Sequence, residues 1–157
     1  MISNRALFTV FGALFGASIP FASLPVNAAE TCVSFKPLEG SQYEVRKTIS
    51  SPGVTPGVRN TWDTDFIVPG GTRFIRYITT ITSELPANYN VIINFRHSNN
   101  TSEQVFRRDG LSLVGGIPFQ IVIEPPASGR QPFQNNTNIS GRQGTTYRVS
   151  VSGCSKN

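Results

Sequence analysis

The sequence predicts an all-β fold: an antiparallel β-sandwich of the jelly-roll or immunoglobulin-like type with seven or eight strands. Three observations support this prediction. Apolar residues recur at every second position in several segments, turn residues separate these segments, and two cysteines lie near opposite ends of the chain beyond residue 28. Alternation with a period of two is typical of half-buried strands, and short strands between turn signals are typical of sandwiches and barrels. No segment beyond residue 28 has a convincing amphipathic helical pattern.

The expected strands in the first half of this region are separated by turns that contain proline and glycine. These turns are PG at 52–53, PG at 56–57 and PGG at 69–71. The segment after the last turn is almost continuously β-branched and aromatic, which predicts a long central strand with both faces partly covered. The four expected strands are Val33–Lys36, Gln42–Ser50, Trp62–Val68 and Thr72–Thr82.

The second half contains the clearest alternation in the chain, at Asn88–His97. Four apolar side chains fall on one face of this segment, and only Ile92 interrupts the polar residues of the other face. Glycine-containing turns at 109–110 and 115–116 bound two shorter strands. A closing strand begins near Thr146, alternates apolar and polar residues, and ends at Gly153. The two shorter strands are Glu103–Arg108 and Ile117–Ile123.

The segment Glu124–Gly144 is rich in proline, glycine, asparagine and glutamine and shows no strand pattern. It is therefore predicted to be a long loop, and loops of this length are usually either functional or loosely ordered. Phe133 lies between Arg130 and Arg142, so it is a candidate apolar anchor of a contact loop in which the arginines donate hydrogen bonds. The alternative is a mobile connection without a binding role.

The first 28 residues have the pattern of a cleavable Sec-type signal peptide. Arg5 provides a basic start, Ala6–Ala17 is apolar, and Val26–Ala28 forms a small-residue cleavage site. The alternative is an uncleaved membrane anchor, but the apolar run is shorter than the roughly 18 residues that a spanning helix needs. The sequence thus predicts residues 1–28 as a signal peptide, residues 29–157 as a single sandwich domain, and a secreted or periplasmic location.

Cys32 and Cys154 are the only cysteines. In an oxidising compartment they are expected to pair with each other, which would place the first and last strands side by side. Closing so long a loop stabilises a fold by about 4 to 5 kcal/mol on the chain-entropy model. Both cysteines are out of phase with the apolar residues of their strands, so the disulfide is predicted at a sheet edge, outside the core. Free thiols and a bridge between two copies are the alternatives.

The charge balance is moderately basic. Loss of Arg5 with the signal peptide would leave 13 basic residues against 9 acidic residues, a net charge of +4. Such a surface favours anionic partners, such as cell-wall polymers, lipid headgroups or acidic proteins, through long-range attraction. The alternative is that the charge serves solubility alone. Nucleic acid is disfavoured as a partner by the predicted compartment and by the absence of a dense basic run in the sequence.

The sequence offers few parts for catalysis, so the protein is predicted not to be an enzyme and to need no cofactor. His97 is the only histidine and ends an apolar strand face, where a strand-end structural role is expected. No nucleophile elbow, zinc-spaced ligand set or phosphate-binding glycine loop is present in the sequence.

Two carboxylates, Asp63 and Asp65, lie two residues apart and therefore project to the same face of their strand. Such a pair can bind a hard cation or form half of an acid and base arrangement of the glycosidase kind. Calcium normally takes about six or more oxygen ligands, and few are grouped here, so no metal site is predicted and the pair is the weak candidate for one. We expect a solvated outer face, with Trp62, Thr64 and Phe66 pointing inward.

Two segments resemble the pre-peptidase C-terminal domain, a secreted bacterial sandwich of jelly-roll type. They are DFIVPGGT at Asp65–Thr72, which is followed by a strand, and the closing strand GTTYRVSVSG at Gly144–Gly153. The resemblance implies a jelly-roll-like fold. It implies no calcium binding or protease accessory role, because YNVIIN at Tyr89–Asn94 replaces the family's Asp-x-Asp segment.

Three functions are compatible with the sequence. The first is a non-catalytic secreted or periplasmic binding or accessory protein whose partner is an extracytoplasmic protein or an anionic polymer. The second is a structural subunit of an exported assembly that completes its sheet by strand exchange. The third is a hydrolase that uses Asp63, Asp65 or Glu44. The first is preferred, and a monomer is expected, because a Cys32–Cys154 disulfide would hold both terminal strands within one protomer.

Overall fold

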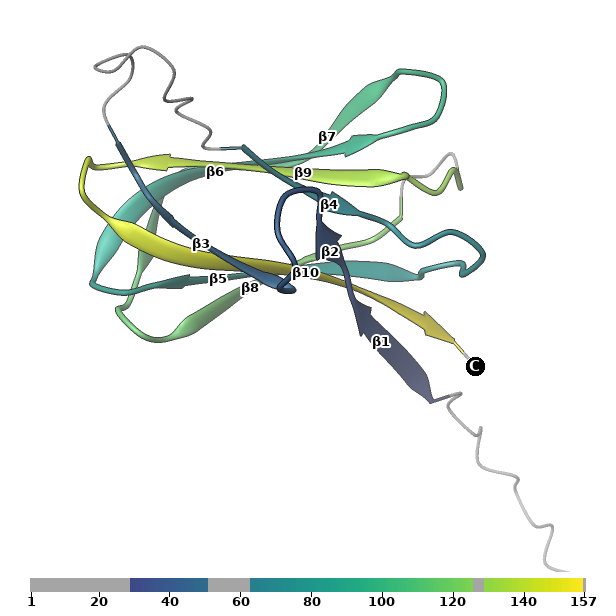
Figure 1. Cartoon of the computed structure of the whole chain (residues 1–157), viewed down its shortest axis with the longest axis horizontal. Helices are drawn as coiled ribbons and strands as arrows, with labels where there is room; N and C mark the ends of the chain where they lie inside the picture. The colour runs from purple at the N-terminus through teal and green to yellow at the C-terminus, as the bar shows by residue number, and fades with distance from the viewer. Residues whose placement is uncertain (1–28, 51–62, 126–128, 157) are drawn as a thin grey trace, which may run out of the picture.

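Two antiparallel five-stranded sheets pack face to face in the computed structural model (Figure 1). It describes residues 29–50, 63–125 and 129–156, so the predicted signal peptide and Trp62 lie outside the described residues. Within these ranges all regular structure is strand, and no helix has the length and hydrophobicity that a membrane crossing needs. The predicted β-sandwich is confirmed, and the described ranges contain ten strands instead of seven or eight.

One sheet, here called the β10 sheet, is built around the last strand. Along one edge of β10, β1 pairs with its C-terminal half and β3 with its N-terminal half. On the other side β5 pairs with β10, and β8 forms the opposite edge of the sheet. The strands are β1 (Glu30–Ser34), β3 (Glu44–Thr48), β5 (Arg76–Ser83), β8 (Pro118–Ile123) and β10 (Thr146–Lys156).

The other sheet, here called the β9 sheet, has the strand order β2-β4-β9-β6-β7. Its central strand β9 lies inside the segment that the sequence predicts to be one long loop, so that prediction is wrong. Gly110 was expected in a turn but lies within β7, which runs beyond it and has two register shifts against β6. The strands are β2 (Lys36–Pro37), β4 (Asp63–Ile67), β6 (Ala87–Arg96), β7 (Ser102–Leu113) and β9 (Gln134–Gly141).

The core lies between the sheets and is made by the inward faces that the alternation predicts. Seven large aromatic side chains are buried in this core, and neighbouring rings meet edge-on or tilted, with centroids 4.7 Å apart for Tyr77 and Phe95 and 5.2 Å apart for Phe35 and Phe74. Such pairs add to the free energy of burial. The aliphatic partners come from both sheets: Ile81, Val91, Ile93, Leu111, Ile121, Ile139, Val149 and Val151.

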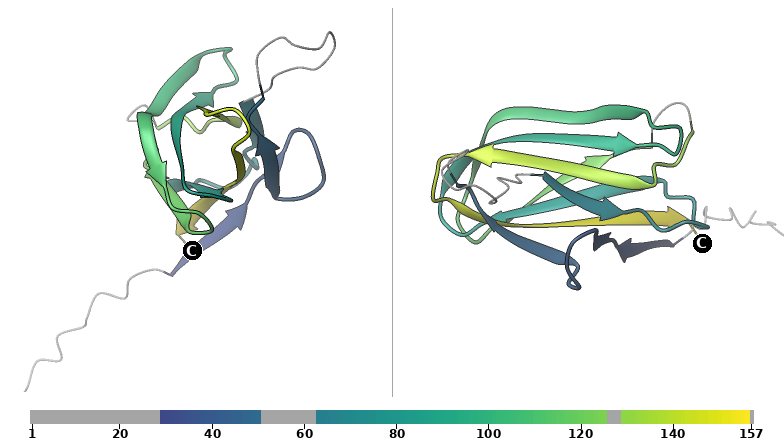
Figure 2. Two further views of the ribbon diagram at one scale, coloured as in Figure 1. Left: turned by 90° about the vertical axis from the view of Figure 1, so that its left-hand side faces the viewer. Right: turned by 45° about the horizontal axis from the view of Figure 1, so that its top comes forward.

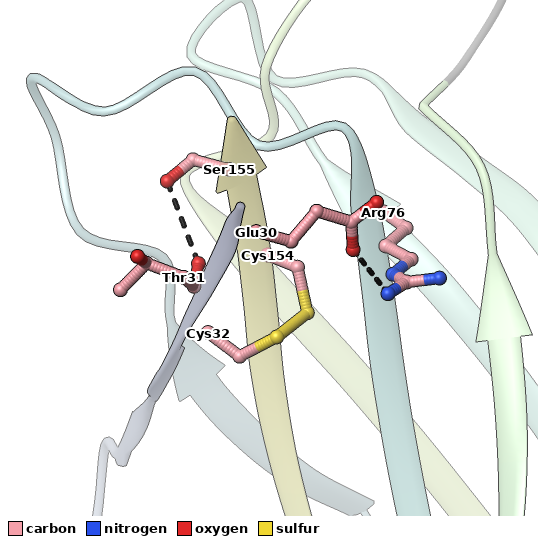
Figure 3. The surroundings of a disulfide bond; sticks show 6 residues. All are labelled: Glu30, Thr31, Cys32, Arg76, Cys154 and Ser155. Atoms are coloured by element: carbon pink, nitrogen blue, oxygen red, sulfur yellow. Dashed lines mark hydrogen bonds and ion pairs between the residues drawn. A yellow bond between two sulfur atoms is a disulfide. The ribbon is translucent and has the colours of Figure 1, made fainter. Parts of the chain in front are cut away.

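The disulfide between Cys32 and Cys154 joins β1 to β10 across a directly paired position, with the Cα atoms 4.0 Å apart. Figure 3 shows it on the outer side of the sheet, beside the ion pair of Glu30 with Arg76. The predicted pairing of the cysteines, the adjacent terminal strands and the position at a sheet edge are therefore confirmed. Cys154 is fully buried there, whereas Cys32 is exposed.

Gly153 gives the most direct test of the core packing. A Cβ atom at this position of β10 would lie 2.5 Å from Cζ of Phe35 and 2.7 Å from Cδ1 of Phe74. We expect Gly153→Ala to lower the free energy of unfolding by about 1 to 3 kcal/mol, because the rings must shift in a close-packed core. Denaturant unfolding measures the change. The control is Gly70→Ala, since nothing lies within 4 Å of the added atom; equal losses in both variants would contradict this packing.

Candidate functional site

Three loops at one end of the sandwich surround Phe133. We call residues 68–75, 96–101 and 129–133 the loop end. Phe133 is 48% exposed and lines two clefts, of about 570 Å³ and about 360 Å³. The larger cleft lies against the β4–β5 loop, and the smaller one against the loop between β6 and β7. An exposed aromatic ring between two clefts is a typical anchor for a ligand or partner.

The backbone of Phe133 is fixed by hydrogen bonds to two other segments. Its N–H donates to the carbonyl of Arg96 at 3.0 Å, and its carbonyl accepts from the N–H of Val68 at 2.9 Å. The side-chain amide of Gln131 accepts from the N–H of Phe74 at 3.2 Å and donates to the carbonyl of Thr72. Residues 131–133 are thus tied to the ends of both sheets and do not form a loose connection.

Each of the two clefts beside Phe133 also contains an arginine. Arg73 lies in the larger cleft and Arg96 in the smaller cleft, both side chains are exposed, and neither forms an ion pair within the described part of the chain. Arg130 and Arg73 together line a third, smaller cleft of about 210 Å³. Guanidinium groups donate several hydrogen bonds in a plane and favour carboxylate and phosphate ligands. The loop end therefore combines an apolar anchor with groups that bind anions.

Arg142 does not join this site, although the sequence groups it with Phe133 and Arg130. The eight residues of β9 separate Arg142 from Phe133, a span of about 30 Å at the rise of an extended strand. Arg142 lies in the β9–β10 turn, where its carbonyl accepts from the hydroxyl of Thr145 at 2.6 Å. Of the three predicted contact residues, the structure places Phe133 and Arg130 at the loop end. Arg142 lies at the other end of β9, because this strand separates it from Phe133.

Asp63 and Asp65 lie on the outer face of the β9 sheet, where they take part in a network of side-chain amides. Asn136 donates from Nδ2 to Oδ1 of Asp65 at 2.7 Å and to Oδ1 of Asp63 at 3.3 Å. Asn138 donates to Asp63 at 3.1 Å, and Asn94 donates to Oδ1 of Asn136 at 3.3 Å. We call these five residues the amide–carboxylate ladder. It links β4, β9 and β6 in one row across the sheet.

Lys47 is a further neighbour of these two carboxylates. Lys47 lies with Asp63 and Asp65 in a cleft of about 220 Å³, and its ammonium donates to the carbonyl of Asp63. Burial lowers the pKa of Lys47, and nearby carboxylates, those of Asp63 and Asp65 among them, offset part of this effect. Over the described ranges, no three His, Cys, Asp or Glu residues lie close enough together to hold a metal ion.

Glu44 lies in the other sheet, so the structure does not combine it with the two aspartates. It pairs with Ser150 in the backbone register of β3 and β10, and its Oε1 is 3.5 Å from Nη1 of Arg148. Thr64 and Phe66 point inward and are buried, as the alternation of β4 predicts. Asp63 is exposed and Asp65 half-buried, which agrees with the expected solvated outer face.

His97 directly follows β6 at the loop end and is 94% buried, since 6% of its surface is exposed. Its backbone N–H donates to the backbone carbonyl of Thr101 at 2.9 Å, and its ring nitrogen Nε2 lies 3.5 Å from Oε2 of Glu103. Nδ1 has no hydrogen-bond partner within the described residues. His97 thus closes the β6–β7 connection, which agrees with the strand-end role expected from the sequence.

No protein-family model and no curated protein matches this sequence. Among solved structures, a point mutant of a family 29 carbohydrate-binding module has a TM-score of 0.47 at 10% identity, with 82% of this chain and 87% of that chain covered. A family 29 module has a TM-score of 0.46 at 10% identity, covering 82% and 90%. With TM-scores below 0.5 and identities near 10%, this likeness supports neither a family nor a function for this chain.

Three residues of the loop end were missed in the sequence: Arg73, Arg96 and Gln131. Arg73 follows the PGG turn and Arg96 ends the clearest alternating strand, so each can be placed at the end of a strand from sequence. Which strand ends meet is decided by the pairing of β9 with β4 and β6. Because β9 was not predicted, nothing in the sequence indicated that these three residues lie near Phe133.

Removal of the central amide of the ladder, that of Asn136, should destabilise the fold. Asn136 is 4% exposed and bonds to two carboxylates, so we expect Asn136→Ala to lower the free energy of unfolding by about 1 to 3 kcal/mol. Urea unfolding followed by fluorescence measures it. Asn88→Ala, at an exposed position of β6, is the matched control and should change stability by less than about 0.5 kcal/mol. An unchanged unfolding midpoint in Asn136→Ala would show that the ladder contributes nothing.

Proposed function

We propose that this protein is a non-catalytic secreted or periplasmic β-sandwich that binds an anionic polymer of the cell envelope or the extracellular space through its loop end. One observation carries the proposal: Phe133 stands half-exposed between two clefts that each contain an arginine without an acidic partner in the described chain. The confirmed disulfide is compatible with an oxidising compartment outside the cytosol.

The arrangement suits a polymer better than a small molecule. The clefts are open grooves that share one ring, so a chain can lie across Phe133 and place acidic groups near Arg73 on one side and near Arg96 on the other. The hydrogen bonds of Phe133 and Gln131 fix the conformation of the site before a ligand binds. Less conformational entropy of the loop is then lost on binding. The net positive charge of the chain adds long-range attraction for a polyanion.

The hydrolase alternative has little support from the geometry. Asp63 and Asp65 accept hydrogen bonds from the amides of the ladder and share a cleft with the ammonium of Lys47. Glu44 lies in the other sheet. A pair of carboxylates for glycoside hydrolysis must face one another across a substrate, whereas Asp63 and Asp65 lie on one face of the same strand and accept hydrogen bonds from the same amide of Asn136.

The proposal is tested with two polyanions and a neutral polymer. We expect the protein to bind polygalacturonate or polyphosphate, measured by calorimetry at low ionic strength, and not to bind dextran. Phe133→Ala should weaken binding by about tenfold or more, as for a central aromatic anchor. Arg96→Gln should weaken it to a similar degree, because a charge-assisted hydrogen bond is lost at the site.

Arg142→Gln is the matched control, since it removes the same charge at the opposite end of β9. It should weaken binding by less than about twofold, the effect of one remote charge that salt partly screens. If Arg142→Gln and Arg96→Gln weaken binding equally, attraction is a property of the net charge and the loop end is not the site. Failure of the unmodified protein to bind either polyanion would also overturn the proposal.

A further inference from the structure

The three clefts of the loop end are neighbours in a row. Phe133 lines both the cleft of about 360 Å³ and the cleft of about 570 Å³, which we call the first and the central cleft. Arg73, Gly129 and Gln131 line both the central cleft and the cleft of about 210 Å³, here called the end cleft. The segments of the loop end lie together at one end of the sandwich in Figure 1 and in the right-hand view of Figure 2. An extended ligand can therefore pass from one cleft to the next.

The row is basic along its whole length. Arg96 lines the first cleft, Arg73 the central cleft, and Arg73 and Arg130 the end cleft. Among the residues that line these three clefts, none is an aspartate or a glutamate. Guanidinium groups bind carboxylates and phosphates with paired hydrogen bonds. The row therefore suits a ligand that carries acidic groups at intervals.

The middle of the row is fixed in position. The side-chain amide of Gln131 binds the backbone on both sides of Arg73, since it accepts from the N–H of Phe74 and donates to the carbonyl of Thr72. Gly129 lies close to the guanidinium, because a Cβ atom at this position would be 3.7 Å from Nη2 of Arg73. Arg73 is thus held between the central and the end cleft before a ligand binds, which lowers the entropy lost on binding.

Phe133 indicates which kind of polyanion fits. Its ring is 48% exposed and has no polar group, so only a ligand with an apolar surface gains from covering it. Inorganic polyphosphate presents oxygen atoms on all sides and has no such surface. A sugar ring has a face of C–H groups, and a uronic acid combines this face with a carboxylate. Phe133 next to arginines therefore matches an acidic sugar better than a phosphate chain.

We propose that the loop end binds a linear chain of uronic acid units, with one sugar ring on Phe133 and the carboxylates of its neighbours at the arginines of the three clefts. This inference rests on the proposed function and narrows its anionic polymer to an acidic polysaccharide. The first and the central cleft have volumes within the range of about 300 to 1,000 Å³ that is usual for ligand pockets. The number of clefts then sets the length of chain that is recognised.

Calorimetry with galacturonate oligomers of increasing length tests the row of clefts. We expect the affinity to rise by about tenfold or more up to about three or four units and then to stay constant, because units beyond the clefts gain no contacts. Arg130→Gln should remove the gain of the last bound unit and change the affinity of the dimer by less than about twofold, since the dimer can occupy the other clefts. Arg142→Gln is the control and should leave the whole series unchanged.

The role of the aromatic ring is tested by comparing two ligands. Phe133→Ala should weaken binding of the galacturonate hexamer by about tenfold or more, and binding of polyphosphate by less than about twofold, because only the sugar covers the ring. Phe119→Ala is the matched control, since its ring is 36% exposed on β8 in the other sheet. It should change the affinity for neither ligand.

Two results would overturn this inference and leave the proposed function intact. One is equal affinity for the galacturonate dimer and hexamer, and the other is an equal loss of polyphosphate and galacturonate binding in Phe133→Ala. In both cases the protein still binds a polyanion, and Arg96→Gln still weakens binding more than Arg142→Gln. If neither polyanion binds, the proposed function and this inference fail together.

Discussion

The pairing of β9 on both of its sides is the constraint on which the site depends. This strand contains one large apolar residue, Ile139, so burial of its own side chains gives it little stability. The outward-facing amide side chains of β9 stabilise it instead, through the hydrogen bonds of the amide–carboxylate ladder. Asn136 donates to Asp63 and Asp65 on β4 and accepts a hydrogen bond from Asn94 on β6. Charged acceptors make the stronger hydrogen bonds of this set.

That pairing fixes where functional residues lie. β9 lies between β4 and β6 in the sheet. Phe133, which precedes β9, therefore lies at one end of the sheet, and Arg142, which follows β9, lies at the other end. The residue before β9 then bonds to Arg96 and Val68, which sets the aromatic ring between two clefts. The binding site is thus a consequence of a polar strand in the middle of a sheet. The disulfide has a parallel role at the edge of the other sheet, where it holds β1 to β10.

Most of the fold could be predicted because its signals are local. The alternation in β6 and β10, the turn residues and the two cysteines gave the sandwich, the adjacent terminal strands and the position of the disulfide. β9 could not be predicted, because QNNTNISG has low strand propensity and its stability comes from partners on β4 and β6 that are distant in sequence.

The same reasoning explains which site residues were found. Phe133 and Arg130 stand out in a polar segment, so composition alone identified them. Arg73 and Arg96 reach the site only through strand pairing, and Arg142 was misplaced because a strand was taken for a loop. The exposure of Phe119 and Val122 on β8 could not be predicted either, since a sequence does not reveal which strand lies at an edge.

Native-state hydrogen exchange in β9 tests this account most directly. If the ladder holds this strand in the centre of its sheet, the paired amides of Asn136 and Asn138 should exchange only through global unfolding, with the same free energy as the amides of β5 and β10. Exchange of the β9 amides at rates close to those of the exposed turn residues Arg142 and Gln143 would show that the strand is not stably paired, and the position of Phe133 would then have no structural basis.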